Sequence, residues 1–528
     1  MNALKDVLAA LRLSLAARRR ACGATALLAA VGAVGISPLA EAAPFASNVV
    51  VSGTNVTFIL NEPADTVGYR VNNGPLQLLS GASKGTKNFS LGAPGDNFTI
   101  AVGKSAATGY TIPTGGTIAI AGSGLSQPTA EAGFAQLSSD ADNFSKYNSP
   151  RGVSVSNDPN APNFGTVYIS NSAAGTTGGR TLGDGMYAIR ADQSDAFGYN
   201  NTAQDPNNKF DGVSASANSP FRVTVADNGE VYVADFSDAN ANVWRLNSNL
   251  TTNDQTLNVV NGPTVLPPGS NHGSTTAVYV EGSSATGDLV MYTLDEDLTT
   301  LVSTGAGSNT DKNSLWRYDI NGSAFPFAGQ PTKVNLTNEL LPAATSDLDR
   351  GADGKFYLAQ NRSAGAEAGI VVLDASGAKI YDSLTASRVL LANPTANDII
   401  RNVLGMAVSE DQKWMAVLLN NSDVAVVPLV AGIPDLANRM VVNTGTDVNS
   451  GRDIAFDAAG NIHYASSGQA LYKVLAPGGT TWARTSYRDG GLAFSVNTTP
   501  VPEPACLGLL GAACMVGMNL VRRRRAAR

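Results

Sequence analysis

Cysteine is almost absent from this chain of 528 residues, and the few that occur stand near its ends: Cys22, Cys506 and Cys514. The long stretch between them, residues 43–500, therefore excludes a disulfide framework, a thiolate metal site and a cysteine nucleophile. About 450 residues without disulfides have to be stabilised by a hydrophobic core, and this length is ample for two domains.

Histidine is nearly as scarce, with His272 and His463 as the two examples. Without cysteine beside them, they offer too little for a zinc site or a Ser-His-Asp triad. His463 stands in a strand-like run next to Tyr464, which predicts a packed strand residue rather than a ligand. The sequence also contains no phosphate-binding loop and no dinucleotide fingerprint.

Basic residues are rare outside the ends of the chain. The whole sequence has 36 Lys and Arg against 43 Asp and Glu. Residues 1–42 hold five basic and two acidic residues and residues 497–528 hold five and one, which leaves 26 against 40, a net charge of −14. Nucleic-acid binding needs a basic footprint, so this acidic body excludes nucleic acid as a partner. The charge suits solubility outside the cell.

Long apolar runs are confined to the two ends. The C-terminal run, residues 505–521, follows Val501, Pro502, Glu503 and Pro504. It is followed by the basic stop Arg522, Arg523, Arg524 and Arg525. About 17 residues reach the lower limit for crossing a bilayer. The arginines should stay in the cytoplasm, with the body outside. A buried C-terminal helix is the alternative, but four adjacent arginines fit poorly into a soluble core.

This tail resembles the PEP-CTERM sorting signal of bacterial surface proteins. The resemblance implies cleavage near Pro502-Glu503-Pro504 by an exosortase-type sorting enzyme and transfer to another carrier. It also implies a setting of exopolysaccharide production and biofilm. The expected location is a transient inner-membrane anchor, followed by the cell surface or the extracellular space.

The N-terminus reads as a secretory signal peptide, residues 1–42. A basic leader that ends in Arg18-Arg19-Arg20 precedes the apolar residues 24–39. Small residues at Ala40 and Ala42 predict that signal peptidase cuts before Ala43. The arginine pair lacks the aromatic residue usual in twin-arginine signals, which favours ordinary Sec export.

Residues 43–122 are predicted to form a small Ig-like β domain. Residues 49–60 and 66–71 are β-branched, partly alternating runs, and Asn72-Asn73-Gly74 is a turn signal. The run 56–64 resembles the opening of a FlgD-type immunoglobulin-like domain, which implies a spacer or assembly module. Residues 123–133, with Gly, Ser and Pro, read as a linker.

From 134 to 496 one pattern recurs, in which an alternating strand, a tight turn, a second strand and a third follow one another. The clearest copies are 219–246 and 451–474, and four less regular ones begin near 152, 276, 356 and 405. Six such units predict an all-β chain with a six-bladed β-propeller, and an array of β-sandwiches is the rival. The units resemble NHL-repeat and SMP-30-like propellers. The spare strand 491–496 is expected to complete the first blade.

The start of each innermost strand of a propeller lies near the mouth of its central channel. Arg151, Arg222, Arg452 and Asp453 hold such positions, with His272 expected nearby. Converging cations can hold an anionic or sugar ligand by charge-assisted hydrogen bonds. Alternatively, each arginine pairs with a carboxylate of a neighbouring blade and stabilises the ring.

Three acidic clusters are candidates for calcium, and none has EF-hand spacing. They are Asp140 with Asp142, Asp295-Glu296-Asp297, and Asp347 with Asp349 and Asp353. SMP-30-like lactonases hold a divalent metal at the channel mouth with acidic and amide side chains. Only Asp453 matches that pattern here, which argues against this activity, so no cofactor is expected.

The sequence therefore predicts an exported surface or matrix protein whose propeller binds a partner or polysaccharide without catalysis. Its expected partners are signal peptidase, the sorting enzyme, and an exopolysaccharide or another envelope protein. A secreted metal-dependent hydrolase or lactonase on the same scaffold is the alternative function.

Overall fold

The computed structural model describes residues 44–497 with gaps at 105–116, 120–125, 129–133, 200–201, 205–218, 237–241, 256–273, 297–313, 328, 330, 336–345, 362–366, 443–450 and 478–480. The predicted signal peptide with Ala40, Ala42 and Ala43 lies outside these residues, as do the sorting motif, the apolar run 505–521 and Arg522 to Arg525. Within the described part of the chain, no helix has the length and apolar character needed to cross a bilayer.

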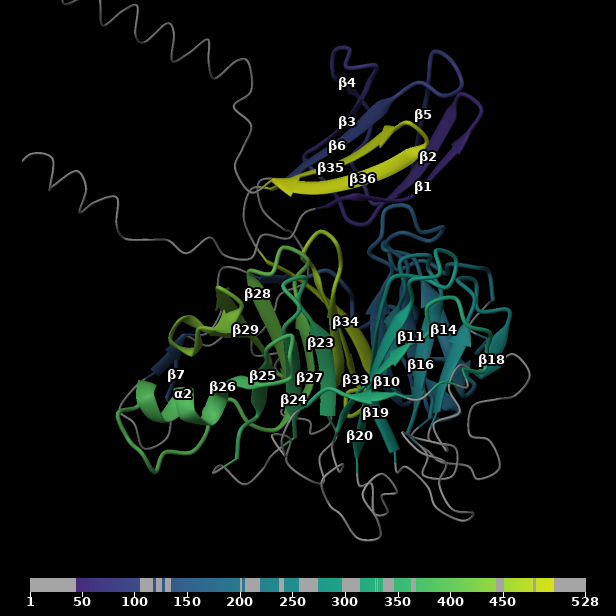
Figure 1. Ribbon diagram of the computed structural model, residues 1–528. Coiled ribbons are helices and arrows are strands. Elements are labelled where there is room, and N and C mark those ends of the chain that lie inside the picture. Colours follow the sequence, from purple (N-terminus) through teal and green to yellow (C-terminus); the bar gives the residue numbers. More distant parts are fainter. Residues whose placement is uncertain are drawn as a thin grey trace, which may run out of the picture. The chain divides into compact units, whose positions relative to one another are not determined.

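The described chain is nearly all-β, as predicted. The one α-helix among the described residues is α2 (Ser383–Leu390). Asp382 caps its N-terminus, and the Asp382 carboxylate accepts a hydrogen bond from the Thr385 amide. Short 3-10 turns occur at η1 (Asn143–Ser145) and η4 (Leu436–Asn438). The rest of the regular secondary structure consists of strands in antiparallel sheets (Figure 1).

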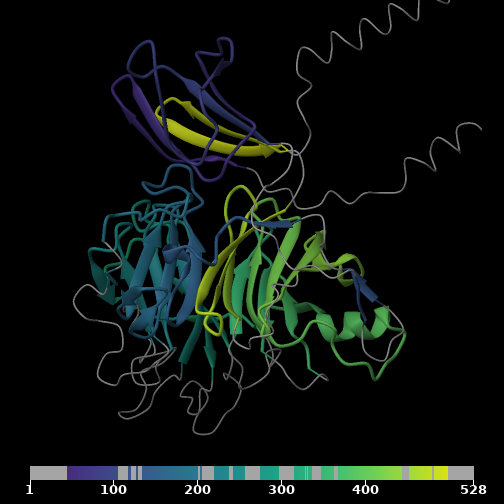
Figure 2. The same ribbon diagram turned by 180° about the vertical axis from the view of Figure 1, so that it is seen from behind.

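The larger part of the chain forms sheets that follow one another in sequence, each beginning with an innermost strand. The innermost strands are β10 (Pro150–Val155), β15 (Val223–Val225), β19 (Ser274–Glu281), β23 (Ser346–Arg350), β27 (Val403–Val408) and β32 (Gly451–Phe456). Each contacts the next in this order, and β32 contacts β10. This circle of contacts is the arrangement of a β-propeller (Figures 1 and 2).

Each sheet continues outward through a second and a third strand. The second strands are β11 (Val167–Asn171), β16 (Val231–Asp235), β20 (Val290–Glu296), β24 (Phe356–Gln360), β28 (Trp414–Leu419) and β33 (Ile462–Ser466). The third strands are β14 (Gly185–Ile189), β17 (Asn242–Leu246), β21 (Leu315–Asp319), β25 (Ile370–Leu373), β29 (Val424–Val430) and β34 (Leu471–Pro477). Shorter outer strands are β18 (Asn253–Gln255), β22 (Thr332–Lys333), β26 (Lys379–Asp382) and β31 (Met440–Val442), with added pieces β12 (Gly175–Thr177), β13 (Arg180–Leu182) and β30 (Ile433–Pro434).

The core lies between neighbouring sheets, because the second strands are buried on both faces. Val231–Asp235 and Phe356–Gln360 are buried at every position. One apolar cluster joins Tyr232 of β16 to Met291 of β20, and another joins Tyr357 of β24 to Met415 of β28. Since a single sheet cannot cover both of its own faces, burial requires the neighbours, and the ring supplies them.

The ring is closed by a strand from the N-terminal side. β9 (Phe134–Gln136) pairs with β34, with Gln136 opposite Leu475. The expectation that residues 491–496 complete the first blade is therefore wrong. They belong to β36 (Gly491–Asn497), which pairs with β35 (Thr481–Arg488), and β35 pairs with β6 (Phe98–Lys104).

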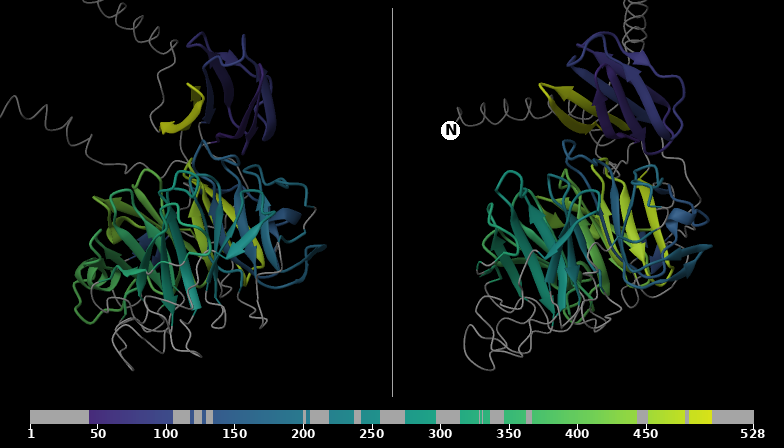
Figure 3. Two further views of the ribbon diagram at one scale, coloured as in Figure 1. Left: turned by 45° about the vertical axis from the view of Figure 1, so that its right-hand side comes forward. Right: turned by 90° about the vertical axis from the view of Figure 1, so that its right-hand side faces the viewer.

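The small β domain is thus built from both ends of the described chain. One sheet has β1 (Ala46–Ser52), β2 (Asn55–Leu60) and β5 (Gly85–Ser90). The other runs β36-β35-β6-β3-β4, with β3 (Thr66–Val71) and β4 (Gln77–Leu78). Figure 3 shows the yellow C-terminal strands beside the purple N-terminal ones. β35 pairs along the edge of β6, and at Tyr487, opposite Phe98, the two rings stack with 5.2 Å between their centroids.

Two local predictions around this domain have different outcomes. The turn at Asn72-Asn73-Gly74 is confirmed, with Asn72 and Asn73 at φ of 50° and 60°. The predicted linker 123–133 contains a strand, β8 (Ser126–Pro128), which pairs with β7 (Thr117–Ala119). The propeller strands end at Pro477, rather than at 496, because β35 and β36 belong to the small domain.

Candidate functional site: a channel with two unlike ends

A β-bulge recurs at the beginning of the innermost strands. The pairing register shifts between Pro150 and Gly152, Thr275 and Ala277, Val403 and Gly405, and Gly451 and Asp453. The skipped residues are Arg151, Thr276, Leu404 and Arg452. Bulges change the direction of a side chain and are frequent at rims and binding sites. Glycine follows two of them because space is short, and a Cβ at Gly152 would lie 2.3 Å from the Phe221 carbonyl oxygen.

Arg151 and Arg452 therefore lie on adjacent strands at the same end of the channel. The Arg151 Nε donates to the Ser172 hydroxyl at 3.0 Å, and the Arg452 Nε donates to the Ser467 hydroxyl at 3.0 Å. Burial and the nearby Arg222 charge lower the pKa of Arg151 to about 10. Burial, Arg151 and Arg222 lower the pKa of Arg452 to about 10. The two arginines that the sequence placed at the start of innermost strands therefore lie at one end of the channel.

Arg222 lies deeper and crosses the channel. Its side chain is 2% exposed and ion-pairs with Asp347 at 3.5 Å and Asp453 at 3.9 Å, which come from two other sheets. It also donates to the backbone carbonyls of Arg151 and Leu404. The alternative reading, an arginine that pairs with carboxylates of other blades and stabilises the ring, describes Arg222 and Asp453.

Carboxylates on the innermost strands connect neighbouring sheets. Asp453 accepts from the Val153 amide at 2.8 Å and Asp347 from the Met406 amide at 2.8 Å. Burial raises the pKa of both, although Arg222 acts in the opposite direction. Only Asp453 was placed at the channel from the sequence. Sequence spacing did not reveal Asp347 as its counterpart, because the sequence offers no sign of which carboxylates face inward.

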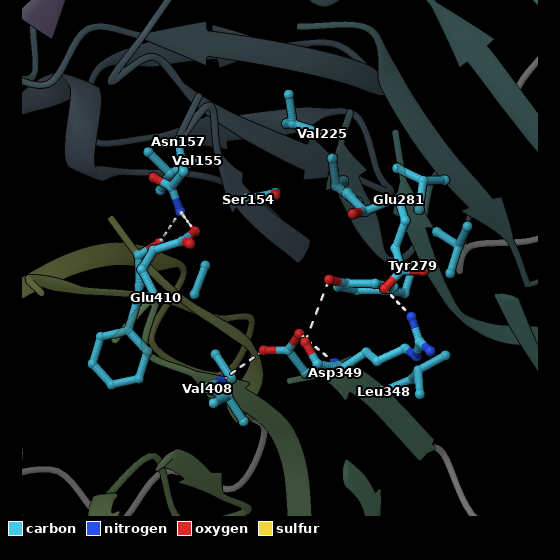
Figure 4. A pocket seen from close by; sticks show the side chains of 18 of the residues that line it. Ser154, Val155, Asn157, Val225, Tyr279, Glu281, Leu348, Asp349, Val408 and Glu410 are labelled. Atoms are coloured by element: carbon cyan, nitrogen blue, oxygen red, sulfur yellow. Dashed lines mark hydrogen bonds and ion pairs between the residues drawn. The ribbon is translucent and has the colours of Figure 1, made fainter. Parts of the chain in front are cut away.

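Beyond Arg222, Asp347 and Asp453, the channel opens into a cavity of about 600 Å³. Residues of all the innermost strands line this cavity. Its lining includes the carboxylates of Glu281, Asp349 and Glu410 (Figure 4). Asp227 lines it as well. Glu281 pairs with Arg350, and Glu410 accepts from Asn157 at 3.1 Å. Tyr279 and Asp349 point into the same space. Of the lining carboxylates, the sequence singled out only Asp349, within a suspected calcium cluster.

The carboxylates of the cavity are held in surroundings that disfavour their charge. Asp349 accepts hydrogen bonds from the amides of Arg350 at 2.7 Å and Val408 at 2.6 Å. Burial nevertheless raises its pKa to about 7. Burial also raises the pKa of Asp227 and of Glu410, whose side chains still reach solvent at the rim. Of these carboxylates, Asp349 is the one whose raised pKa lies near neutral pH.

The acidic residues of the suspected calcium clusters make separate local contacts. Asp140 pairs with Lys473 at 3.1 Å, Asp142 caps η1, and Asp353 pairs with Lys355. Asp295 and Glu296 lie in β20, and Asp297 lies outside the described residues. Among the residues that the structure describes, no group of three or more His, Cys, Asp or Glu side chains is placed to hold a metal ion.

His463 is a packed strand residue, as predicted, and it is 3% exposed. One ring nitrogen lies 2.6 Å from the Tyr472 hydroxyl and the other 3.2 Å from an Asp457 carboxylate oxygen. His463 of β33 therefore connects Tyr472 of β34 with Asp457, which follows the end of β32. His272, the other histidine, lies outside the described residues.

Comparison with known proteins assigns this chain to no family. No protein-family model and no curated protein matches the sequence. Among solved structures, it is similar to a protein of unknown function from Bacteroides thetaiotaomicron, at 12% identity and a TM-score of 0.41, over 84% of this chain and 99% of that one. A second is the WD40 β-propeller domain of Doa1, at 12% identity and 0.34, over 65% and 95%. A third is the calcium structure of a family AA12 carbohydrate-active enzyme from Trichoderma reesei, at 10% and 0.41, over 70% and 99%.

Proposed function

We propose that this chain is an exported, sorted surface protein whose six-bladed propeller binds a sugar unit of an envelope polysaccharide in its acidic cavity. The observation that carries the proposal is the cavity of about 600 Å³ at one end of the channel. This volume falls within the range of about 300–1,000 Å³ typical of small-ligand sites.

The chemistry of the cavity wall suits a polyhydroxylated ligand. Sugar hydroxyls donate hydrogen bonds, and carboxylates are strong acceptors for them. Asp227 and Glu410 offer such acceptors at the rim, while the Tyr279 ring offers an apolar face beside Asp349. The acidic rim favours a neutral or amino sugar over an anionic one at this end of the channel.

Export and sorting rest on the sequence at both ends of the chain. The basic and apolar leader supports secretion, and the motif 501–504 with the apolar run and four arginines supports processing by a sorting enzyme. An envelope polysaccharide is a ligand that a protein at this location would meet.

Glycan-array binding tests the sugar proposal, with the full chain purified in mild detergent. We expect binding to neutral or amino-sugar oligosaccharides, weakened at least tenfold by Glu410→Gln with Tyr279→Ala. Asp319→Asn is the matched control, because Asp319 is an exposed carboxylate that pairs with Arg317 outside the cavity. No binding by the wild-type chain, or equal loss in the control, would refute the proposal.

A second candidate function is a secreted hydrolase or lactonase, and one observation favours it. Asp349 faces the cavity with a pKa raised to about 7, which suits a general base at neutral pH. Lactone hydrolysis by the wild-type chain, lost on chelation and restored by calcium, would establish this alternative in place of non-catalytic binding.

A further inference from the structure

A buried ion pair joins the two sheets of the small β domain. Glu62 follows the end of β2 in one sheet, and Lys104 ends β6 in the other. The Lys104 Nζ lies 2.6 Å from the Glu62 Oε2. The Lys104 side chain is 4% exposed and the Glu62 side chain 3% exposed. An amine and a carboxyl group are therefore held in direct contact and away from water.

Backbone hydrogen bonds fix the segments that carry this pair. The Asp65 amide donates to the Gly103 carbonyl at 2.9 Å, which holds the turn after β2 against the end of β6. On its other side, β6 pairs with β35, with Lys104 opposite Thr481. Holding two groups in contact in this way replaces a bimolecular encounter by an intramolecular step, which greatly favours a reaction between them.

The pair is incompletely hydrogen-bonded in its ionic form. A lysine ammonium has three donors, and a carboxylate has two acceptor oxygens. Within the described part of the chain, the buried Glu62 Oε1 has no hydrogen-bond partner, and the ammonium of Lys104 donates to Glu62. A buried ion pair is stable only where further hydrogen bonds satisfy the remaining donors and acceptors. The charges are therefore poorly stabilised here.

The neutral form of the carboxyl group is accessible for the same reason. Burial raises the pKa of Glu62 to about 7, although the charge of Lys104 acts in the opposite direction. A proton can therefore pass from the ammonium to the carboxylate across the 2.6 Å contact. That transfer leaves a free amine, which is a nucleophile, beside a carboxylic acid.

We propose that Lys104 and Glu62 condense after folding into an intramolecular amide, which joins the two sheets covalently. The Nζ attacks the Cδ of Glu62 and forms an N–C bond. A C–O bond of the carboxyl group breaks, and its oxygen leaves with two protons as water. No oxidant or reductant is required. The product is uncharged and has one N–H and one carbonyl group, so fewer buried donors are left without a partner.

This bond would brace a domain that no disulfide can brace, because residues 43–500 contain no cysteine. A covalent link between residues 62 and 104 closes a loop and restricts the unfolded chain, as a disulfide at the same positions would. The inference does not depend on the ligand proposed for the propeller, since both residues belong to the small β domain.

Mass spectrometry of the tryptic peptides tests the bond, on full chain that is folded in mild detergent and denatured only for digestion. Trypsin does not cut after a lysine whose amine is acylated, so the site after Lys104 should stay intact. In most molecules we expect the peptide that ends at Arg70 to be joined to the peptide that begins at Asn88. The joined species should be lighter than the sum of the two by one water.

Two substitutions complete the experiment. Lys104→Arg keeps the positive charge but removes the nucleophile, because a guanidinium group does not lose its proton in proteins, and it should abolish the joined peptide. Lys87→Arg is the matched control. Lys87 lies on β5 of the same domain, and its Nζ donates to the Ser83 hydroxyl at 3.2 Å rather than to a buried carboxylate. The joined peptide should persist in this variant.

Two outcomes would overturn the inference. One is cleavage after Lys104 in most wild-type molecules, with Glu62 in a peptide of its sequence mass. The other is a fragment spectrum that places the amide of Lys104 on a different carboxyl group. Both are read from the wild-type chain, so they decide the question even if Lys104→Arg does not fold. Sugar binding is measured separately, so failure of either proposal leaves the other standing.

Discussion

The carboxylate of Asp349 accepts a 2.6 Å hydrogen bond from the backbone amide of Val408 in the neighbouring innermost strand. The same side chain faces the acidic cavity, so it stabilises the ring and borders the proposed ligand at once. Its protonation should therefore be visible in the stability of the propeller.

The free energy of unfolding should decrease as the pH rises from about 4 to about 7, because of Asp349. Its pKa is raised by burial to about 7 in the folded chain, so the folded state holds a proton that the unfolded state has lost. This difference lowers the free energy of unfolding by at most roughly 4 kcal/mol. Urea unfolding at pH 5 and pH 8 measures it. Asp349→Asn should show a smaller loss between these pH values than wild type, and identical losses would contradict the assignment.

Arg222→Met should destabilise the propeller strongly. It leaves Asp347 and Asp453 buried without their cation, and breaking a buried ion pair in this way costs about 3–5 kcal/mol. Denaturant unfolding measures the change. Arg70→Met, at an exposed position, should stay within about 0.5 kcal/mol of wild type. A small effect of Arg222→Met would mean that the two aspartates are held by their backbone amides alone.

His463→Phe should cost about 1–3 kcal/mol, because Asp457 and Tyr472 each lose a buried hydrogen-bond partner. Tyr472→Phe removes one of those partners. The double variant should therefore lose less stability than the two single losses added together. Strict additivity in a double-mutant cycle would show that His463 and Tyr472 do not interact.

Ending the chain after Pro477 should unfold the small β domain and spare the propeller. The cut removes β35 and β36, which cover the edge of β6 and stack Tyr487 on Phe98. Hydrogen exchange should show lost protection in β3 and β6 and retained protection in β24 and β28. Protected β6 amides in the shortened chain would contradict the described pairing.

The proposed sorting signal predicts in which cell fraction the protein will be found. A chain that ends at Pro500 should be released in soluble form after export, because it lacks the apolar run and the arginine stop. The full chain in a strain without the sorting enzyme should remain in the inner-membrane fraction. Fractionation and immunoblotting distinguish the two, and soluble full-length protein in that strain would refute the anchor.

The repeat could be read from the sequence because each unit encodes its own strands and turns. The run Val231–Asp235 and its equivalents predicted the second strands well, since they are buried on both faces. The positions of Arg151 and Arg452 could also be read, because both stand at the start of a recurring strand, β10 and β32. The residue pattern within one unit was enough to predict the strands of that unit.

Features that depend on distant pairing were not readable. Residues 491–496 look the same in the sequence whether they close a blade or join β35, and β35 in turn pairs with β6, which lies far away in the chain. The acidic cavity was missed for a similar reason. Its carboxylates come from different sheets, at positions such as Asp227 and Glu410 that resemble ordinary turn residues.

The small β domain, assembled from both ends of the described chain, has a consequence for the timing of folding. β6 ends at Lys104 and its partner β35 begins at Thr481, so the first-made half must wait for nearly the whole chain to follow. At a synthesis rate of about 5–20 residues per second, that delay is roughly 20 to 75 seconds. Throughout it, an unpaired strand edge is open to chaperones or to a neighbouring molecule, and the arrival of the C-terminal hairpin ends that exposure.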